Sequence, residues 1–291
     1  MMPRTWQHYT GKYIKPVFLL FAFSLIHSVL GCAYKDQPSQ PYLILYAFDA
    51  EGEQLAAQMS VQSNERHLGR TVRIGQLGGK NVVLAESGMG MTNAAMTTQR
   101  IIDFYHPRAV IMTGIAGAID DTVDIGDIVV CAEWIQHDYG YMGSGGFESS
   151  ELLVYNPSED SIVQVLSFPV DSELLSTVRG LRDVGVDLKK IGSRLPELLV
   201  GGVGVSGNTF IDSKEKRELL AKEFGALIVD MESAAVAHVC SANNVPFVVF
   251  RSASDLAGGS GSETAAKELE EFFQVAADIS SKVVIKFLNE L

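Results

Sequence analysis

The chain contains few cysteines and no cluster of basic residues. Its three cysteines, Cys32, Cys131 and Cys240, are too few for a disulfide framework, and the last two lie among apolar neighbours, as buried free thiols do. The cysteines and the six histidines show no spacing typical of a metal site, so we expect neither a metal nor a cofactor. A net charge of −12 without a basic run argues against a nucleic-acid partner, because the phosphates would repel the chain.

A hydrophobic run long enough to cross a membrane is also absent. The apolar stretch near the N-terminus, residues 16–30, is shorter than the roughly 20 residues that a transmembrane helix needs. It follows a basic stretch that contains Arg4, Lys12 and Lys15 but no acidic residue, and it ends in Val29-Leu30-Gly31-Cys32. This ending resembles a bacterial lipobox, in which the cysteine becomes the lipidated first residue.

These features predict a lipoprotein signal peptide over residues 1–31, a lipidated Cys32 and a polar tether over residues 32–41. The protein would then be exported and held by a lipid anchor on a bacterial cell membrane. Two alternatives stay open: residues 1–31 could be an uncleaved membrane anchor, or the chain could be cytosolic with its start assigned too far upstream. The remaining residues, 42–291, are numerous enough for one large domain.

From Tyr42 onward, short apolar runs alternate with longer segments of helical periodicity. Strands are expected at Tyr42–Phe48, Val82–Ala85, Ala109–Thr113, Ile128–Ala132, Leu198–Val203, Leu227–Val229 and Phe247–Phe250. Helices are expected at Met91–Tyr105, Ser213–Phe224, Ser233–Asn243 and Glu263–Leu288, with Ser213 as an N-cap. This alternation predicts an α/β fold around a central, largely buried sheet. The segment 139–172 is the least regular and is expected to be a long excursion beside a site.

Five segments place glycine or acidic residues near the ends of expected strands, where ligands bind in open α/β sheets. They are Ala47–Glu51, Ser87–Gly90, Gly114–Ala118, Val229–Ser233 and Arg251–Asp255. In this order and spacing they resemble the nucleoside phosphorylase/nucleosidase superfamily, and within it the 5′-methylthioadenosine/S-adenosylhomocysteine nucleosidases. The resemblance runs from Tyr42 to the C-terminus, apart from residues 139–172. It implies a single-domain, three-layer sandwich with a mixed central sheet between helices, and a small adenine nucleoside as the substrate.

Cleavage of a ribosyl–adenine bond by water requires an acid at the purine and a base on the opposite face of the sugar, as in inverting glycosidases. The resemblance assigns the purine acid to Asp255 and the water-activating base to Glu51. Asp255 follows an apolar strand and a serine, a setting that suits a carboxyl group with a raised pKa. From the residues alone, Asp255 could instead be a helix N-cap, and Glu51 a solvated carboxylate in a first helical turn.

The resemblance also implies which residues bind the substrate. Glu232 would accept hydrogen bonds from the 2′ and 3′ hydroxyls of the ribose, and Met231 would pack under the sugar. Phe210 and Ile211 would contact the adenine. Alternatively, Glu232 could be a capping residue, Met231 ordinary core, and the Phe210–Ile211 pair the apolar end of a strand. Two polar residues complete the set of candidates: Ser87 matches a residue near the catalytic water and the sugar, and Arg251 would orient Asp255 or Glu51.

The attacking nucleophile must be water or phosphate, because the superfamily contains hydrolases and phosphorylases. Phosphate needs cationic donors, and the phosphorylases have arginines near the first turn and before the central glycines. Here the first turn carries Glu51, Met112-Thr113 precedes the central glycines, and Ile115 replaces an expected serine. A carboxylate at Glu51 would repel a phosphate dianion, so water is the expected nucleophile. A phosphorylase remains the alternative within the enzyme class.

The resemblance finally implies an assembly. Relatives use the region of residues 139–172 to close the site of a neighbouring subunit, so a homodimer is expected, in which Tyr139, Tyr141 and Phe147 line the 5′ side of a pocket. These aromatics could instead cover the core of their own chain.

The alternative to an enzyme is a protein of another class, a lipoprotein that binds nucleosides without turnover.

Overall fold

The computed structural model describes residues 40–291. The predicted signal peptide 1–31, the predicted lipidation site Cys32 and the tether up to residue 39 lie outside the described residues. Among residues 40–291, no helix combines the length and the apolar character needed to traverse a bilayer.

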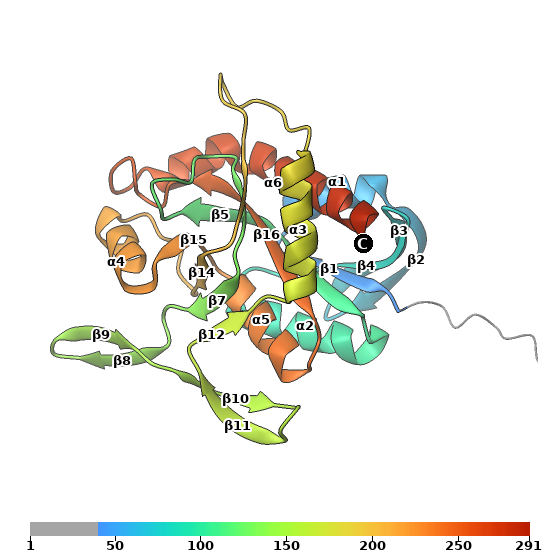
Figure 1. The fold of residues 1–291 in the computed structure, drawn as a ribbon, viewed down its shortest axis with the longest axis horizontal. Helices are drawn as coiled ribbons and strands as arrows, with labels where there is room; N and C mark the ends of the chain where they lie inside the picture. Colours follow the sequence, from blue (N-terminus) through green and yellow to red (C-terminus); the bar gives the residue numbers. More distant parts are fainter. Residues whose placement is uncertain (1–39) are drawn as a thin grey trace, which may run out of the picture. The chain divides into compact units, whose positions relative to one another are not determined.

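A large mixed sheet forms the centre of the fold (Figure 1). Its strands run in the order β12-β7-β14-β15-β5-β1-β4-β3-β2, and β16, β6 and β13 continue from the other edge of β5. The bounds are β1 Tyr42–Tyr46, β2 Ser60–His67, β3 Arg70–Leu77, β4 Lys80–Glu86, β5 Ala109–Ala118, β6 Ile128–Val130, β7 Glu133–Gln136, β12 Ser167–Pro169, β13 Leu198–Val200, β14 Val203–Ser206, β15 Ala226–Asp230 and β16 Phe247–Asp255. The strands β1 and β16 are buried along their whole length, as expected for strands covered on both faces.

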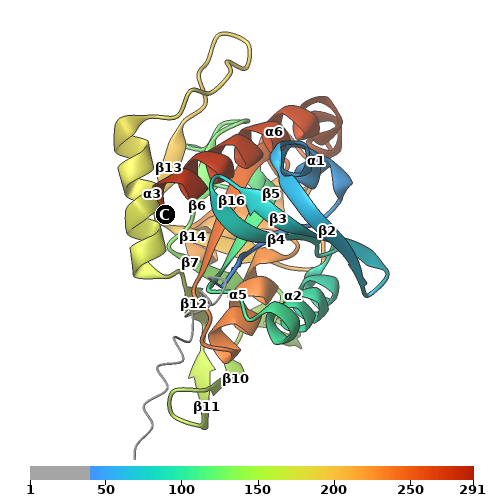
Figure 2. The same cartoon turned by 90° about the vertical axis from the view of Figure 1, so that its right-hand side faces the viewer.

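Six helices flank this sheet in the described part of the chain: α1 Asp49–Gln58, α2 Met91–Tyr105, α3 Ser172–Val184, α4 Lys214–Phe224, α5 Ser233–Ala242 and α6 Ala265–Glu290. Helices α1 and α3 pack against α6 on one side of the sheet, and α2 packs against α5 on the other (Figure 2). The predicted three-layer α/β sandwich with a mixed central sheet is therefore confirmed. Ser213 is the N-cap of α4, as predicted, and its hydroxyl accepts the N–H of Lys216 at 3.3 Å.

The structure differs from the expectations in two segments. The single strand expected at Leu198–Val203 is split into β13 and β14, because Gly201 and Gly202 between them have φ angles of 118° and 73°. The segment 139–172 is also more regular than expected. It holds the hairpins β8 Gly140–Gly143 with β9 Gly146–Ser149 and β10 Leu152–Asn156 with β11 Ser161–Val165, followed by β12 and the start of α3.

The pairing of β5 positions the site. Along one edge, residues 109–112 of β5 pair in parallel with β1, and residues 117–118 pair antiparallel with β15. Because β1 and β15 run toward each other along this edge, their carboxyl ends face the intervening stretch 113–116 of β5. The other edge of β5 is covered by β16. Such a switch of strand partners opens a crevice at strand ends, where α/β proteins bind ligands.

Candidate active site

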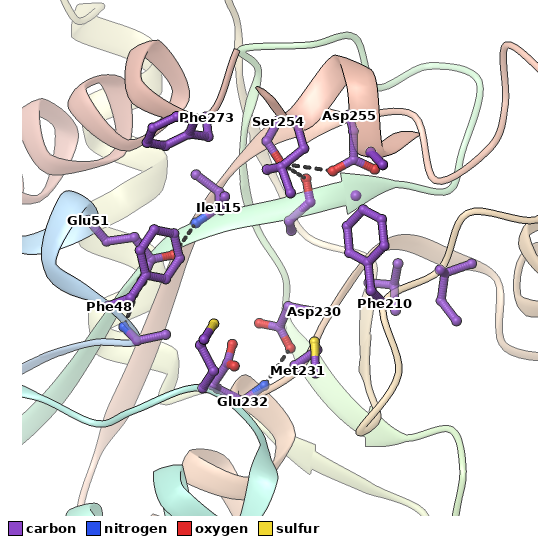
Figure 3. A pocket seen from close by; sticks show the side chains of 18 of the residues that line it. Phe48, Glu51, Ile115, Phe210, Asp230, Met231, Glu232, Ser254, Asp255 and Phe273 are labelled. Carbon is purple, nitrogen blue, oxygen red and sulfur yellow. Dashed lines mark hydrogen bonds between the residues drawn. The ribbon is translucent and has the colours of Figure 1, made fainter. Parts of the chain in front are cut away.

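A cavity of about 520 Å³ opens at this switch point (Figure 3). Its walls come from the β1–α1 turn, from Ile115–Gly117 of β5, from residues 209–211 after β14, from residues 229–232 at the end of β15, from the end of β16 and from one face of α6. This volume lies within the range of roughly 300–1,000 Å³ that is usual for small-molecule sites. All five motif segments therefore reach one cavity, although the Ser87–Gly90 turn contributes Met89 alone.

Glu51 lies in the first turn of α1 and is only 1% exposed. Its Oε2 accepts the backbone N–H of Ala47 at 2.6 Å, and its Oε1 accepts that of Ile115 at 2.9 Å. Burial raises the pKa of Glu51, while the guanidinium of Arg251 and these N–H groups oppose the rise. Gly114 allows this approach, because a Cβ built there would lie 2.2 Å from Glu51 Oε1. Glu51 is thus a held, buried carboxyl rather than a solvated one.

Arg251 is fully buried in the middle of β16 and contacts three carboxylates. Its Nε lies 2.7 Å from Asp230 Oδ2, its Nη2 3.2 Å from Glu232 Oε2, and its Nη1 3.4 Å from Glu51 Oε1. Of the two partners expected for Arg251, Glu51 is the one to which it is bonded. A single guanidinium therefore fixes the relative positions of three acidic side chains, which leaves the cluster with excess negative charge when all three are ionised.

Glu232 directly precedes α5 and lines the cavity. Burial raises the pKa of Glu232 to about 7, against the opposing effect of Arg251 and with the charge of Asp230 adding to the rise. Its Oε1 accepts the backbone N–H of Gly90 at 2.8 Å. Glu232 occupies the N-cap position of α5 but makes no capping bond with its side chain, so capping is not what holds its carboxylate.

Asp255 ends β16 and is also almost completely buried. Its Oδ2 accepts the hydroxyl of Ser254 at 2.8 Å, and its Oδ1 accepts the N–H of Ala257 at 2.9 Å. Burial raises the pKa of Asp255 to about 6, although these two bonds oppose the rise. No helix begins at this position, since α6 starts only at Ala265. Asp255 and Glu51 lie at different sides of the cavity (Figure 3).

The apolar candidates are found on the cavity walls. Phe210, Ile211 and Met231 all line it, and Phe210 is 43% exposed, which leaves its ring accessible to a ligand. Ser87 differs from them, because it is completely buried, is not among the lining residues, and donates its hydroxyl to the carbonyl of Gly88 at 3.1 Å. Tyr139, Tyr141 and Phe147 do not line the cavity of their own chain, and Tyr141 is 66% exposed on the β8–β9 hairpin.

The sequence did not single out several residues that build the site. Asp230 accepts the hydroxyl of Ser206 at 2.5 Å and the N–H of Ser233 at 3.1 Å besides its ion pair with Arg251. Its signal was an aspartate directly after an apolar strand. Phe48 and Phe273 add aromatic wall on the side of Glu51 (Figure 3). Within residues 40–291, no group of three or more His, Cys, Asp and Glu side chains is arranged to hold a metal ion.

Comparison with known proteins assigns this architecture to a family. Residues 41–289 match the model of the phosphorylase superfamily. The chain is 33% identical over 219 residues to the 5′-methylthioadenosine/S-adenosylhomocysteine nucleosidase of Staphylococcus haemolyticus, which covers 75% of this chain and 85% of that relative.

Solved structures agree. The nucleosidase of the same name from Neisseria meningitidis, in complex with methylthio-immucillin-A, matches 87% of this chain and 100% of its own with a TM-score of 0.72 and 28% identity. The futalosine hydrolase of Helicobacter pylori strain 26695 matches 87% of this chain and 98% of its own, with a TM-score of 0.71 and 26% identity. The resemblance stated from the sequence is thereby confirmed: the chain belongs to the phosphorylase superfamily and is similar, within it, to the 5′-methylthioadenosine/S-adenosylhomocysteine nucleosidases.

Proposed function

We propose that the chain hydrolyses the N-glycosidic bond of an adenine nucleoside of the 5′-methylthioadenosine or S-adenosylhomocysteine type, releasing adenine and the free sugar. The observation that carries this proposal is the placement of two buried carboxyl groups with raised pKa values, Glu51 and Asp255, at different sides of one cavity. A third, Glu232, lies on the wall below both of them in the view of Figure 3. Relatives that carry the nucleosidase name support the same chemistry.

Asp255 acts as the acid. With a pKa of about 6, its carboxyl group is partly protonated near neutral pH and can donate a hydrogen bond to N7 of the purine. As the C1′–N9 bond breaks, the electron pair goes to the purine, and the proton of Asp255 neutralises it. The ring of Phe210, exposed at the same side of the cavity, offers a surface for the base (Figure 3).

Glu51 and Glu232 act on the sugar. Glu232 accepts hydrogen bonds from the ribose hydroxyls, which strengthen as the sugar takes on oxocarbenium character. Glu51 takes a proton from a water molecule, and the resulting hydroxide bonds to C1′. Arg251 holds both carboxylates at distances of 3.4 and 3.2 Å, so it is a positioning residue rather than a proton carrier.

Water suits this cavity better than phosphate does. Among the described residues that line it, none is Lys, Arg or His, and the nearby guanidinium of Arg251 is already bonded to three carboxylates. The N–H of Ile115 is occupied by Glu51. A phosphate dianion would therefore meet carboxylates without a counter-ion.

The decisive experiment follows adenine release from 5′-methylthioadenosine in phosphate-free buffer. Free 5-methylthioribose is the expected sugar product, and added phosphate should leave the rate unchanged. A phosphorylated sugar, formed at a rate that rises with phosphate, would make the chain a phosphorylase. Tight binding of the nucleoside without any release of adenine would make it a binding protein.

The proposal has two further parts, a lipid anchor and a homodimer. Residues 1–32 support export and a lipid anchor at Cys32, as the basic stretch, the apolar run and the lipobox-like ending indicate. Exposed aromatic residues on the β8–β9 hairpin, such as Tyr141, support a homodimer in which this segment closes the 5′ side of a neighbour's cavity. Both have their own tests below.

A further inference from the structure

The charged side chains that line the cavity are all acidic. Five of its lining residues are acidic, namely Glu51, Asp230, Glu232, Asp255 and Glu270, and the described lining contains no basic side chain. Three of these carboxylates share Arg251, and Asp255 has its bonds to Ser254 and Ala257. Glu270 differs from the other four, because its side chain is exposed and makes no hydrogen bond or ion pair with any described residue.

Glu270 belongs to a face of α6. Ala266, Leu269, Glu270 and Phe273 recur at intervals of three and four residues, so they lie on one side of the helix, and all four line the cavity. Leu269 and Phe273 are partly buried there, whereas Glu270 is exposed at the opening. This face therefore combines an apolar surface with one unpaired carboxylate.

If the chain acts as proposed above, the position of this face of α6 determines which part of the nucleoside it contacts. The adenine lies between Phe210 and Asp255, and the ribose lies at Glu232 and Glu51. Phe48 and Phe273 lie on the same side of the cavity as Glu51, away from Asp255 (Figure 3), so the 5′ substituent extends along this side toward α6. A thioether suits the aromatic edges, and a longer 5′ chain would reach the carboxylate of Glu270.

A neighbouring subunit would not change the sign of the charge. Residues 139–172, the segment proposed to close a partner's cavity, contain acidic residues such as Glu148 and Glu151 but no Lys, Arg or His. Neither the α6 residues that line the cavity nor residues 139–172 therefore provide a counter-ion for an anionic 5′ substituent.

We propose that Glu270 is a specificity-determining residue, which favours adenine thionucleosides whose 5′ chain ends in an ammonium group over those whose chain ends in a carboxylate. An exposed ion pair contributes a few tenths to about 1 kcal/mol in proteins, which corresponds to a preference of about two- to fivefold. Repulsion between Glu270 and the carboxylate should weaken binding of the anionic analogue, relative to the neutral one, by a similar factor. Salt should weaken both effects, because the carboxylate is exposed to solvent.

The test uses three adenosine analogues of matched length, with 5′-butylthio, 5′-(3-aminopropyl)thio and 5′-(2-carboxyethyl)thio groups. Their kcat/KM values and their dissociation constants, from calorimetry, are measured at low ionic strength without phosphate. We expect the order ammonium, neutral, carboxylate for the native chain. E270Q should reduce the ratio of ammonium to carboxylate by about four- to twentyfold, and E270K should invert the order.

E271Q is the matched control, because Glu271 is the exposed neighbour on α6 that does not line the cavity. E271Q should keep the native ratio of ammonium to carboxylate analogue. An equal fall of this ratio in E271Q and E270Q would mean that the overall negative charge of α6 sets the preference, and would overturn the assignment to Glu270. An unchanged ratio in both E270Q and E270K would overturn it as well. If no analogue releases adenine but the affinities still follow charge and respond to E270Q, the proposed function fails while the role of Glu270 stands.

Discussion

The substitution Asp255→Asn should abolish most activity and at the same time stabilise the protein at alkaline pH. The asparagine has nearly the same shape, and its Oδ1 can still accept the N–H of Ala257. Its amide can donate to the hydroxyl of Ser254, which then accepts instead of donating. The local hydrogen bonds therefore survive, and the change removes mainly the ionisable proton.

The size of the effect follows from the pKa of Asp255, which burial raises from 3.8 to about 6. At 1.36 kcal/mol for each pKa unit, ionisation costs the folded state about 3 kcal/mol. Because the folded-state pKa is the higher one, the contribution of Asp255 to stability is complete below about pH 4 and is lost as the pH rises through about 6. The asparagine does not ionise, so the variant does not lose stability in this way. Its free energy of unfolding should therefore exceed that of the native chain by a difference that grows from near zero at pH 4 to at most about 3 kcal/mol at pH 8.

Urea unfolding at several pH values between 4 and 8.5 measures this difference, and turnover of 5′-methylthioadenosine is followed in parallel. Asp212→Asn is the control, since Asp212 accepts the N–H groups of Ala265 and Ala266 at the start of α6. Loss of that charge should destabilise the protein by about 0.5–1 kcal/mol at pH 8. If Asp255→Asn were also less stable than the native chain at pH 8, Asp255 would be a stabilising cap and could not be the purine acid.

Four further predictions test the rest of the site and the assembly. Glu51→Gln should lower kcat by about 10²–10⁴-fold with the fold intact by circular dichroism, and near-native turnover would remove Glu51 from the mechanism. Arg251→Met should cost about 3–5 kcal/mol in urea unfolding, because it leaves three buried carboxylates without their cation, and a loss below about 1 kcal/mol would contradict that account. Deletion of residues 142–148 should raise KM for 5′-thio nucleosides far more than for adenosine; an equal loss for both, or a fully active monomer by light scattering, would refute the shared site. Cys32→Ser should release the protein from membranes or stall its processing, and an intact N-terminus on a cytosolic form, found by mass spectrometry, would exclude the anchor.

Elements with a strong hydrophobic period could be predicted from the sequence, and elements without one could not. Helix α2 has the predicted bounds, because its buried residues recur at three and four over four turns. Strand β2 was missed, since seven of its eight residues are exposed and only pairing with β3 holds it in the sheet. Helix α1 was not among the expected helices either, because Gly52, a poor helix former, lies within it; a Cβ at that position would lie 2.5 Å from the ring of Tyr46.

Some residues of the site could likewise be predicted from the sequence, and others could not. The three carboxyl groups could be found from the sequence because each stands beside a strand end in a recognisable segment. The sharing of Arg251 among Glu51, Asp230 and Glu232 could not, because it joins residues from β16, α1 and the end of β15 that only the folded sheet brings together. The contribution of α6 was also hidden, since Leu269, Glu270 and Phe273 have the spacing of any amphipathic helix.

The shared arginine explains how one cavity can hold an acid and a base at the same pH. Glu51, Asp230 and Glu232 together carry more negative charge than Arg251 can neutralise, and burial raises the pKa of Glu232 to about 7. Asp255 lies apart from this cluster, and its pKa of about 6 is set mainly by burial. Excess negative charge on the sugar side is unfavourable in the empty site, but it attracts the cationic sugar that forms as the glycosidic bond breaks. A neutral carboxyl on the purine side meets the anion that leaves. The cavity is therefore complementary in charge to the separated ions of the transition state rather than to the neutral nucleoside.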